Sequence, residues 1–322
     1  MANILITGIT GMVGSHLANY ILTNYENHNV GGLIRWRSPK DNIKDILKKV
    51  TLFHGDLNDL SSLINILNSF KPKKIFHLAA QSYVQDSFIM PSETLRTNVI
   101  GTSNLLEAIR ISNIDPLIHI CSSSEVYGQV TEKEVPITEN NPLRPLSPYA
   151  VSKVGEDMIA FQYFHSFGLK IIRTRMFTHT GPRRGFVFAE GAFAKQIAEI
   201  EKNIHTDGFV KVGNLDSVRT FSDVRDAVEA YWILLEKCKP GEVYNIGGDD
   251  TMTVGQMLEI LKKKSTVKIT HKIDKTLLRP SDVTLQIPDS SKFRRETGWK
   301  PKFKVEQTME DLLNYYRKQI NV

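Results

Sequence analysis

The sequence predicts an α/β protein with a doubly wound parallel sheet and a smaller C-terminal α/β domain. Short apolar runs of strand length alternate with helical stretches out to about residue 175, an order typical of a parallel sheet that is covered by helices on both faces. The composition shifts after that point, and the helix and strand pattern resumes near residues 220–247. We therefore expect a larger domain at residues 1–175 plus 218–247 and a smaller one at residues 176–217 plus 248–322.

Composition and charge argue against several classes of protein. The 322 residues are 41% apolar and 24% charged, as in soluble globular proteins, and the length suffices for a large core. The net charge is +6, but lysine and arginine are spread along the chain, which fits a solvated surface better than a nucleic-acid interface. The two cysteines and the spacing of the histidines predict neither a disulfide framework nor a metal site. With no signal peptide and no long apolar run, we expect a cytoplasmic protein without a membrane partner.

A glycine-rich turn near the N-terminus predicts a site for a dinucleotide. Residues 3–7 form an apolar strand, a G-x-x-G-x-x-G turn follows, and residues 15–24 are helical. Glycines allow the backbone to approach a pyrophosphate, and the helix N-terminus supplies N–H donors. This order predicts a Rossmann-type domain. The residues expected to contact the cofactor here are Gly8, Thr10, Gly11, Met12, Val13 and Gly14.

The end of the second strand predicts which dinucleotide is bound. Residues 30–34 are apolar, and Arg35-Trp36-Arg37-Ser38 follows. An acidic residue there would bind the ribose 2′-hydroxyl of NAD, whereas Arg35, Arg37 and Ser38 suit the 2′-phosphate of NADP. Two exposed loop arginines without a ligand are the alternative. We predict NADP, with NAD as the less favoured cofactor.

Two later strand ends extend the predicted cofactor site. Asp56 follows an apolar strand, where its carboxylate can accept from the adenine amino group, and Leu57 comes next. The strand at residues 75–78 ends in small residues that let the backbone lie close to the cofactor. The contacts expected there are Leu78, Ala79 and Ala80.

Tyr149 and Lys153 predict the chemistry. They are four residues apart, so on a helix they share a face. Lys153 can hold the nicotinamide ribose and lower the pKa of Tyr149, which then exchanges a proton with a substrate hydroxyl during hydride transfer. Ser123 is the best candidate to complete this site, with Ser122 and Ser124 as competitors.

Glu125 adds a second chemical role. A carboxylate beside the Tyr149–Lys153 pair can perform acid–base chemistry at a neighbouring carbon. Together these residues indicate oxidation, elimination and reduction on one sugar ring. A surface or helix-end carboxylate is the alternative for Glu125.

These motifs resemble those of the extended short-chain dehydrogenases/reductases that act on nucleotide sugars, and in particular the GDP-mannose 4,6-dehydratase group. The resemblance covers essentially the whole chain. It is carried by residues 78–82, 123–128, 147–153, 181–185, 212–215 with Arg219, 278–280 and 297–301.

Three departures bear on the substrate. Ser123 replaces the threonine that is usual in the group, and Thr178-His179 replaces Asn-His, as in the branch that acts on GDP-mannoheptose. Residues 193–197 and 212–215 also resemble the reductases that act on GDP-4-keto-6-deoxymannose.

The resemblance implies a GDP-sugar 4,6-dehydratase that converts GDP-mannose or GDP-mannoheptose to the 4-keto-6-deoxy sugar by internal hydride transfer from C4 to C6. A reductase or epimerase on the same fold is one alternative. A dinucleotide-sensing regulator without catalysis is another, and the intact Tyr149 and Lys153 argue against it. The resemblance also implies a homodimer through the helix at residues 98–110 and the helix of Tyr149, or a tetramer with a contact through residues 35–39.

Basic side chains of the second half are candidates to bind the diphosphate and base, because guanidinium groups match phosphate oxygens well. The wider set includes Arg173, Arg175, Arg183 and Lys211. Together with polar residues of the resembling motifs, the substrate contacts that we predict are Gln81, Ser82, Thr178, His179, Arg184, Lys195, Asn214, Arg219 and Arg279.

Overall fold

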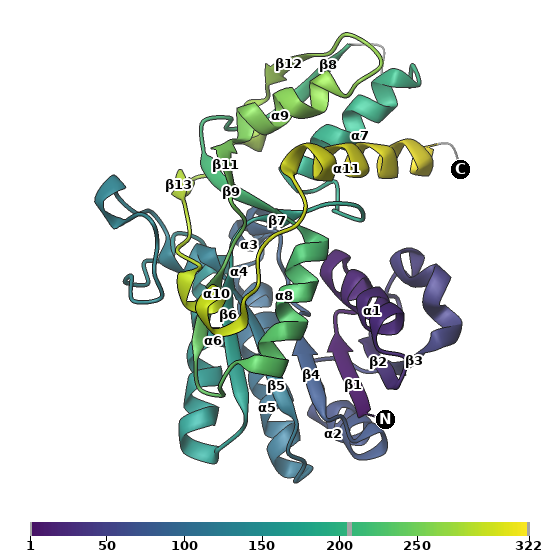
Figure 1. The fold of residues 1–322 in the computed structure, drawn as a ribbon, viewed down its shortest axis with the longest axis vertical. Coiled ribbons are helices and arrows are strands. Elements are labelled where there is room, and N and C mark those ends of the chain that lie inside the picture. The colour runs from purple at the N-terminus through teal and green to yellow at the C-terminus, as the bar shows by residue number, and fades with distance from the viewer. Residues whose placement is uncertain (1, 205–207, 321–322) are drawn as a thin grey trace.

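A seven-stranded parallel sheet forms the larger part of the computed structural model, which describes residues 2–204 and 208–320 (Figure 1). Its strand order is β10-β6-β5-β4-β1-β2-β3. The order reverses between β1 and β4, so their carboxyl ends flank the crevice where ligands bind in this kind of sheet. The strands are β1 (Ala2–Thr7), β2 (His28–Ile34), β3 (Val50–His54), β4 (Lys74–His77), β5 (Leu117–Ser123), β6 (Ile171–Met176) and β10 (Val243–Ile246).

Helices cover both faces of this sheet. On one face α1 (Met12–Asn24) and α8 (Val224–Lys237) pack together over one apolar core. On the other, α2 (Leu60–Phe70), α5 (Gly101–Ile111) and α6 (Pro148–Phe167) pack over a second. Because both faces are covered, the central strands β4, β5 and β6 are almost wholly buried, as expected for a parallel sheet. The predicted doubly wound α/β fold is confirmed.

The smaller part lies above the carboxyl ends of the sheet (Figure 1). It has a separate apolar core that includes Phe193, Leu258 and Leu312. Its strands are β7 (His179–Thr180), β8 (Phe209–Val212), β9 (Val218–Asp223), β11 (Asp250–Thr253), β12 (Thr270–Ile273) and β13 (Leu285–Gln286), and its helices are α7 (Ala189–Glu201), α9 (Val254–Lys263) and α11 (Val305–Ile320). The remaining short helical elements are η1 (Asp41–Lys49), α3 (Val84–Ile89), α4 (Pro91–Leu95), η2 (Arg96–Ile100), η3 (Ser124–Tyr127), η4 (Glu132–Glu134), η5 (Lys275–Leu277) and α10 (Ser291–Thr297).

The chain returns to the larger sheet late in the sequence. β9 pairs with β11, β13 and β7 in the smaller part. α8 then packs against α1, and β10 pairs with β6. The expected domain boundaries at residues 175, 218 and 247 remain a prediction, and β9 is the segment of residues 218–247 that pairs outside the larger sheet.

Two arginines considered for the substrate are structural. Arg173 and Arg175 lie on the fully buried β6 and donate to Asp157 of α6 at 2.7 Å and 2.8 Å. Arg175 also donates to the hydroxyl of Tyr127 at 3.0 Å. Since their guanidinium groups are engaged inside the core, we do not retain them as diphosphate contacts.

Candidate active site

The glycine-rich turn has the shape that a phosphate cradle requires. Gly8 has a φ of +74°, and the N–H of Gly11 donates to its carbonyl at 3.0 Å. A Cβ on Gly14 would lie 2.2 Å from the same oxygen, so only glycine fits there. Gly11 caps α1 without a side-chain hydrogen bond, which leaves the first N–H groups of the helix for a ligand. Thr10, Met12 and Val13 complete this turn.

The ends of β1 and β4 are tied together beside the cradle. The hydroxyl of Thr7 accepts from the N–H groups of Leu78 and Ala79 at 3.1 Å and 3.2 Å. A Cβ on Gly8 would lie 2.9 Å from the nitrogen of Ala79. The segment Leu78–Ala79–Ala80 therefore runs directly past the glycine turn, and these residues fit the adenine dinucleotide that the sequence predicts.

The two arginines expected to select NADP follow β2 and are exposed. The backbone turns back at this point, because the N–H of Arg35 donates to the hydroxyl of Ser38 at 3.0 Å. Arg37 stacks over the ring of Trp36 at 4.3 Å. Asp56, after β3, accepts from the N–H of Asn58 at 2.9 Å, and Leu57 is buried beside it. The exposed guanidinium groups of Arg35 and Arg37 remain available to a phosphate.

Tyr149 stands in the first turn of α6. Pro148 occupies the first helical position, and the hydroxyl of Ser147 caps the helix by accepting from Ala150 N–H at 3.0 Å. Burial raises the pKa of Tyr149, while the charge of Lys153 and a hydrogen bond with Ser123 act to lower it. The phenol is therefore held between a hydroxyl and an ammonium group, as acid–base work with a substrate hydroxyl requires.

The serines around Ser123 have other partners. The hydroxyl of Ser122 donates to the carbonyl of Lys153 at 3.2 Å, and that of Ser124 donates to Gln286 at 3.1 Å. Ser123 accepts from the N–H of Glu125 at 3.2 Å and interacts with Tyr149. The geometry thus supports Ser123 over its two competitors.

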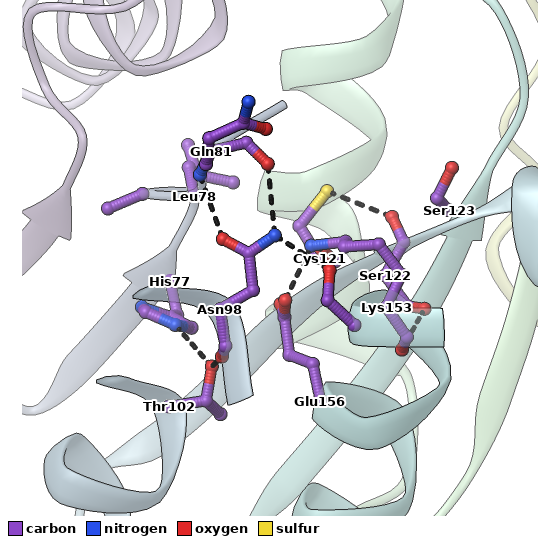
Figure 2. Close-up of polar contacts among 12 residues, drawn as sticks. His77, Leu78, Gln81, Asn98, Thr102, Cys121, Ser122, Ser123, Lys153 and Glu156 are labelled. Carbon is purple, nitrogen blue, oxygen red and sulfur yellow. Dashed lines mark hydrogen bonds and ion pairs between the residues drawn. The ribbon is translucent and has the colours of Figure 1, made fainter. Parts of the chain in front are cut away.

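Lys153 is buried and points into the space between β5 and α6 (Figure 2). Its Nζ donates to the carbonyl oxygen of Cys121 at 2.6 Å and to Oε2 of Glu156 at 2.7 Å. Burial lowers the pKa of Lys153, but Glu156 and Tyr149 outweigh it, so the pKa is raised and the side chain stays charged. Glu156 was not predicted from the sequence, although an acidic residue three positions after Lys153 indicates an ion pair on one helix face.

Glu125 lies in η3, directly after the strand that ends in Ser123. Burial raises the pKa of this carboxyl, Arg219 and Arg279 lower it, and Asp282 raises it again. The net pKa lies above the ordinary value. A carboxyl whose pKa is raised, two residues after Ser123, is a candidate to accept and return a proton.

Asp282 contacts three of the residues that are predicted to bind the substrate, and it was not itself predicted from the sequence. Its carboxylate lies 3.9 Å from Arg219 and 3.8 Å from Arg279. It also accepts from Asn214 at 2.8 Å. Its position three residues after Arg279 could have indicated the pairing, but only the fold brings Arg219 and Asn214 to it.

A second group of predicted substrate residues follows β6. The guanidinium of Arg184 stacks on Phe188 at 3.7 Å and lies 3.6 Å from the buried Glu190. Its Nε is buried without a hydrogen-bond partner among the described residues, as expected of a donor that awaits a ligand. Burial and the charge of Arg184 lower the pKa of His179 to about 4, so this imidazole is neutral. Thr178, the preceding residue, accepts from Ser222 N–H through its carbonyl.

The other predicted contacts lie after β4 and on α7. Gln81 donates its backbone N–H to Asn98 at 2.8 Å, and its side-chain oxygen has no partner among the described residues. Ser82 is exposed beside it. Lys195 on α7 pairs with Glu199 and faces the ring of Phe186. Asn98, which also donates to Ser152 at 2.8 Å, was not predicted.

Within residues 2–204 and 208–320, no three His, Cys, Asp or Glu side chains are grouped so that they could hold a metal ion. In the same part of the chain, no helix combines the length and apolar character needed to span a bilayer.

The fold and the Ser123–Tyr149–Lys153 arrangement define a protein of the short-chain dehydrogenase/reductase class. The family model of GDP-mannose 4,6 dehydratase matches residues 5–312. The chain belongs to this family.

The individual relatives that match this chain carry the names of two different enzymes, a dehydratase and a reductase. The chain is 32% identical to a GDP-mannose 4,6 dehydratase of Drosophila melanogaster, over 96% of this chain and 84% of the relative. It is 30% identical to a GDP-6-deoxy-D-mannose reductase of Pseudomonas aeruginosa, over 98% of both chains. The solved structure of RMD from Pseudomonas aeruginosa, complexed with NADPH, superposes with a TM-score of 0.86 and 28% identity, covering 99% of this chain and 100% of that one.

Proposed function

We propose that the protein is a GDP-sugar 4,6-dehydratase that forms a 4-keto-6-deoxy sugar from GDP-mannose or GDP-mannoheptose. One observation carries the proposal. A carboxyl of raised pKa, Glu125, directly follows the strand end that bears Ser123, and Ser123 contacts the Tyr149 phenol. Besides the hydride acceptor, oxidation needs only Tyr149 and Lys153, whereas elimination of water needs a further acid–base group, a role that we assign to Glu125.

NADP is the cofactor that these residues fit. The glycine turn would hold its pyrophosphate, and Arg35 and Arg37 would bind its 2′-phosphate. The remaining contacts are expected from Asp56, Leu57 and the backbone of residues 78–80. When bound, NADP would supply the hydride acceptor for oxidation at C4 and, once reduced, the hydride for C6.

The side chains perform the proton transfers. Tyr149 takes the proton of the C4 hydroxyl as C4 is oxidised, and Lys153 stabilises the phenolate. The new ketone acidifies the C5 proton, which Glu125 removes. The C6 hydroxyl leaves as water with a proton from Glu125 or Ser123. As C6 is reduced, C5 is reprotonated, and the proton that Tyr149 took from the C4 hydroxyl closes the balance. Arg184, Arg219 and Arg279 are the candidates to bind the diphosphate, with Gln81, Ser82, Thr178, His179, Lys195 and Asn214 around the rest of the nucleotide sugar.

We also propose a cytoplasmic homodimer, or a tetramer built from it. The support is a set of exposed apolar side chains on neighbouring elements of one side of the sheet. They include Ile100 of η2, Ile111 of α5, and Val151, Met158 and Phe161 of α6.

A second candidate function is the reduction of a GDP-4-keto-6-deoxy sugar. The observation that favours it is the match to the Pseudomonas aeruginosa reductase. This match covers 98% of both chains, so the two sequences align over nearly all of their length. This function would leave Glu125 without an obligatory role.

A mass measurement distinguishes the two functions. The purified protein is incubated with a panel of nucleotide sugars and no added cofactor. We expect one GDP-sugar to lose water and the denatured protein to release NADP. A gain of two hydrogens that depends on added NADPH would identify a reductase instead, and release of NAD alone would overturn the cofactor prediction.

A further inference from the structure

Glu156 is a buried carboxylate that the reaction proposed above does not use. It lies on α6 three residues after Lys153 and is 1% exposed. Its Oε2 accepts from Lys153 Nζ at 2.7 Å (Figure 2). Burying two opposite charges costs free energy that their attraction only partly returns. Apolar residues in place of both partners would fill the space at little cost, whereas loss of Glu156 alone would leave the buried ammonium of Lys153 unpaired, so the reason for this carboxylate lies in Lys153.

The position of Lys153 depends on this carboxylate. A lysine ammonium has three N–H donors. One donates to the carbonyl of Cys121 on β5 and one to Glu156, so among the described residues the third remains for a ligand beside Tyr149. Without Glu156 the flexible side chain would keep the single carbonyl contact, and its ammonium would be held less firmly.

We propose that Glu156 is a positioning residue for the Tyr149–Lys153 pair. It holds the ammonium of Lys153 against β5 and offsets part of the positive charge that Lys153 presents to Tyr149. Tyr149 and Glu156 are seven residues apart, so on α6 they stand two turns apart, roughly 10 Å along the axis, with Lys153 between them.

The neighbouring groups Asp157, His77 and His119 do not hold or offset the charge of Lys153. Asp157 is engaged by two arginines of β6. Burial lowers the pKa of His77 and of His119 to about 3, so both are neutral. Burial raises the pKa of Glu156, whereas the charge of Lys153 and its hydrogen bond lower it and so favour the ionised carboxylate. The titratable and charged groups around the pair are Tyr149 and Asp157 on α6, His77 on β4, His119 and Cys121 on β5, Arg173 and Arg175 on β6, and Tyr231 on α8.

Glu156→Gln tests the proposal because it removes the charge and keeps the shape. Two quantities are measured against pH: kcat with the GDP-sugar, and the phenolate absorbance of Tyr149, obtained as the difference from the same protein carrying Tyr149→Phe. Both titrations should move to lower pH by about one unit, since an offsetting negative charge has been lost. Titrations that stay within a few tenths of a unit of wild type would overturn the proposal. Glu259→Gln, which breaks an exposed i,i+3 pair with Lys262 on α9, is the matched control and should leave both unchanged.

Glu156→Asp separates charge from reach. It keeps the negative charge, so the titrations should stay near their wild-type pH, but the shorter side chain should lower kcat by about tenfold. If Glu156→Gln does not fold, a wild-type kcat in Glu156→Asp would overturn the proposal. If neither variant folds, the carboxylate serves the fold alone and the proposal is wrong.

The inference rests on the proposed function of Tyr149, and the two can fail separately. If the wild-type protein converts no GDP-sugar, the proposed function is wrong. The phenolate titration needs no substrate, so it still decides whether Glu156 sets the charge at Tyr149.

Discussion

Tyr149 and Glu125 divide the proton transfers between two carbons of one sugar. Tyr149→Phe removes the phenolic proton acceptor and keeps the ring. We expect turnover to fall by roughly 10²–10⁴-fold, the range of general acid–base catalysis, while cofactor binding persists. Steady-state kinetics and a cofactor titration measure the two effects. Tyr163→Phe is the control, because it removes another phenol of α6, one that contacts Glu107 of α5. Activity within a few-fold of wild type would remove Tyr149 from the mechanism.

Glu125→Gln separates oxidation at C4 from elimination. The amide is nearly isosteric, so substrate should bind, but it cannot accept the C5 proton. We expect dehydrated product and exchange of the C5 proton with heavy water both to fall by at least about 10²-fold. Glu132→Gln, at an exposed carboxylate of η4, is the matched control. Wild-type conversion by Glu125→Gln would favour the reductase or epimerase alternative.

Single residues were predictable from the sequence where the signal is local. Tyr149 and Lys153 share one helix face, and the glycine turn is contained in seven consecutive residues, Gly8 to Gly14. Asn98, and the contact of Asp282 with Asn214, could not be found in this way, because the partners lie 17 and 68 residues apart and only the fold brings them together. Arg173 and Arg175 entered the wider set of candidates for the same reason, since their partner Asp157 faces them only after α6 packs on β6.

At the scale of elements, the strands and helices of the first half followed from their apolar runs, with shifts of a few residues. The predicted helix at residues 15–24 begins at Met12, because the turn after Gly11 is already helical. The small sheet of β9, β11 and β13 was harder to predict. Its strands are short and come from distant parts of the chain, so no local period marks their pairing.

The central strands β4 and β5 also set how the protein responds to acid. His77 and His119 are buried in them, and burial followed by nearby charges lowers the pKa of each to about 3. The unfolded chain binds a proton at each site near pH 6.5. The stability contributed by the neutral rings is therefore complete above pH 6.5 and is lost as the pH falls toward about 3.

This titration predicts a falling free energy of unfolding between about pH 7 and about pH 5, by about 2 kcal/mol for each histidine. Urea unfolding at the two pH values measures it. His119→Gln should lose about 2 kcal/mol less than wild type over this interval. Equal losses in the two proteins would show that His119 does not titrate on unfolding.

At the scale of the whole molecule, the exposed apolar side chains of η2, α5 and α6 predict a homodimer with two-fold symmetry. Light scattering at micromolar concentration should give twice the mass of 36.5 kDa, or four times for a tetramer. Met158→Glu should weaken the dimer by at least about tenfold. Ile273→Glu, on the exposed strand β12 of the smaller part, should not. A wild-type monomer would contradict the prediction.

Internal hydride transfer is the central claim about the whole catalytic cycle, and deuterium tests it most directly. GDP-mannose and GDP-mannoheptose, each labelled with deuterium at C4, are incubated with the protein without added cofactor, and the products are examined by mass spectrometry and NMR. The account predicts loss of one water and a deuterium that has moved to C6 of the 4-keto-6-deoxy product. Conversion with the label lost to added cofactor, or conversion without loss of water, would contradict it.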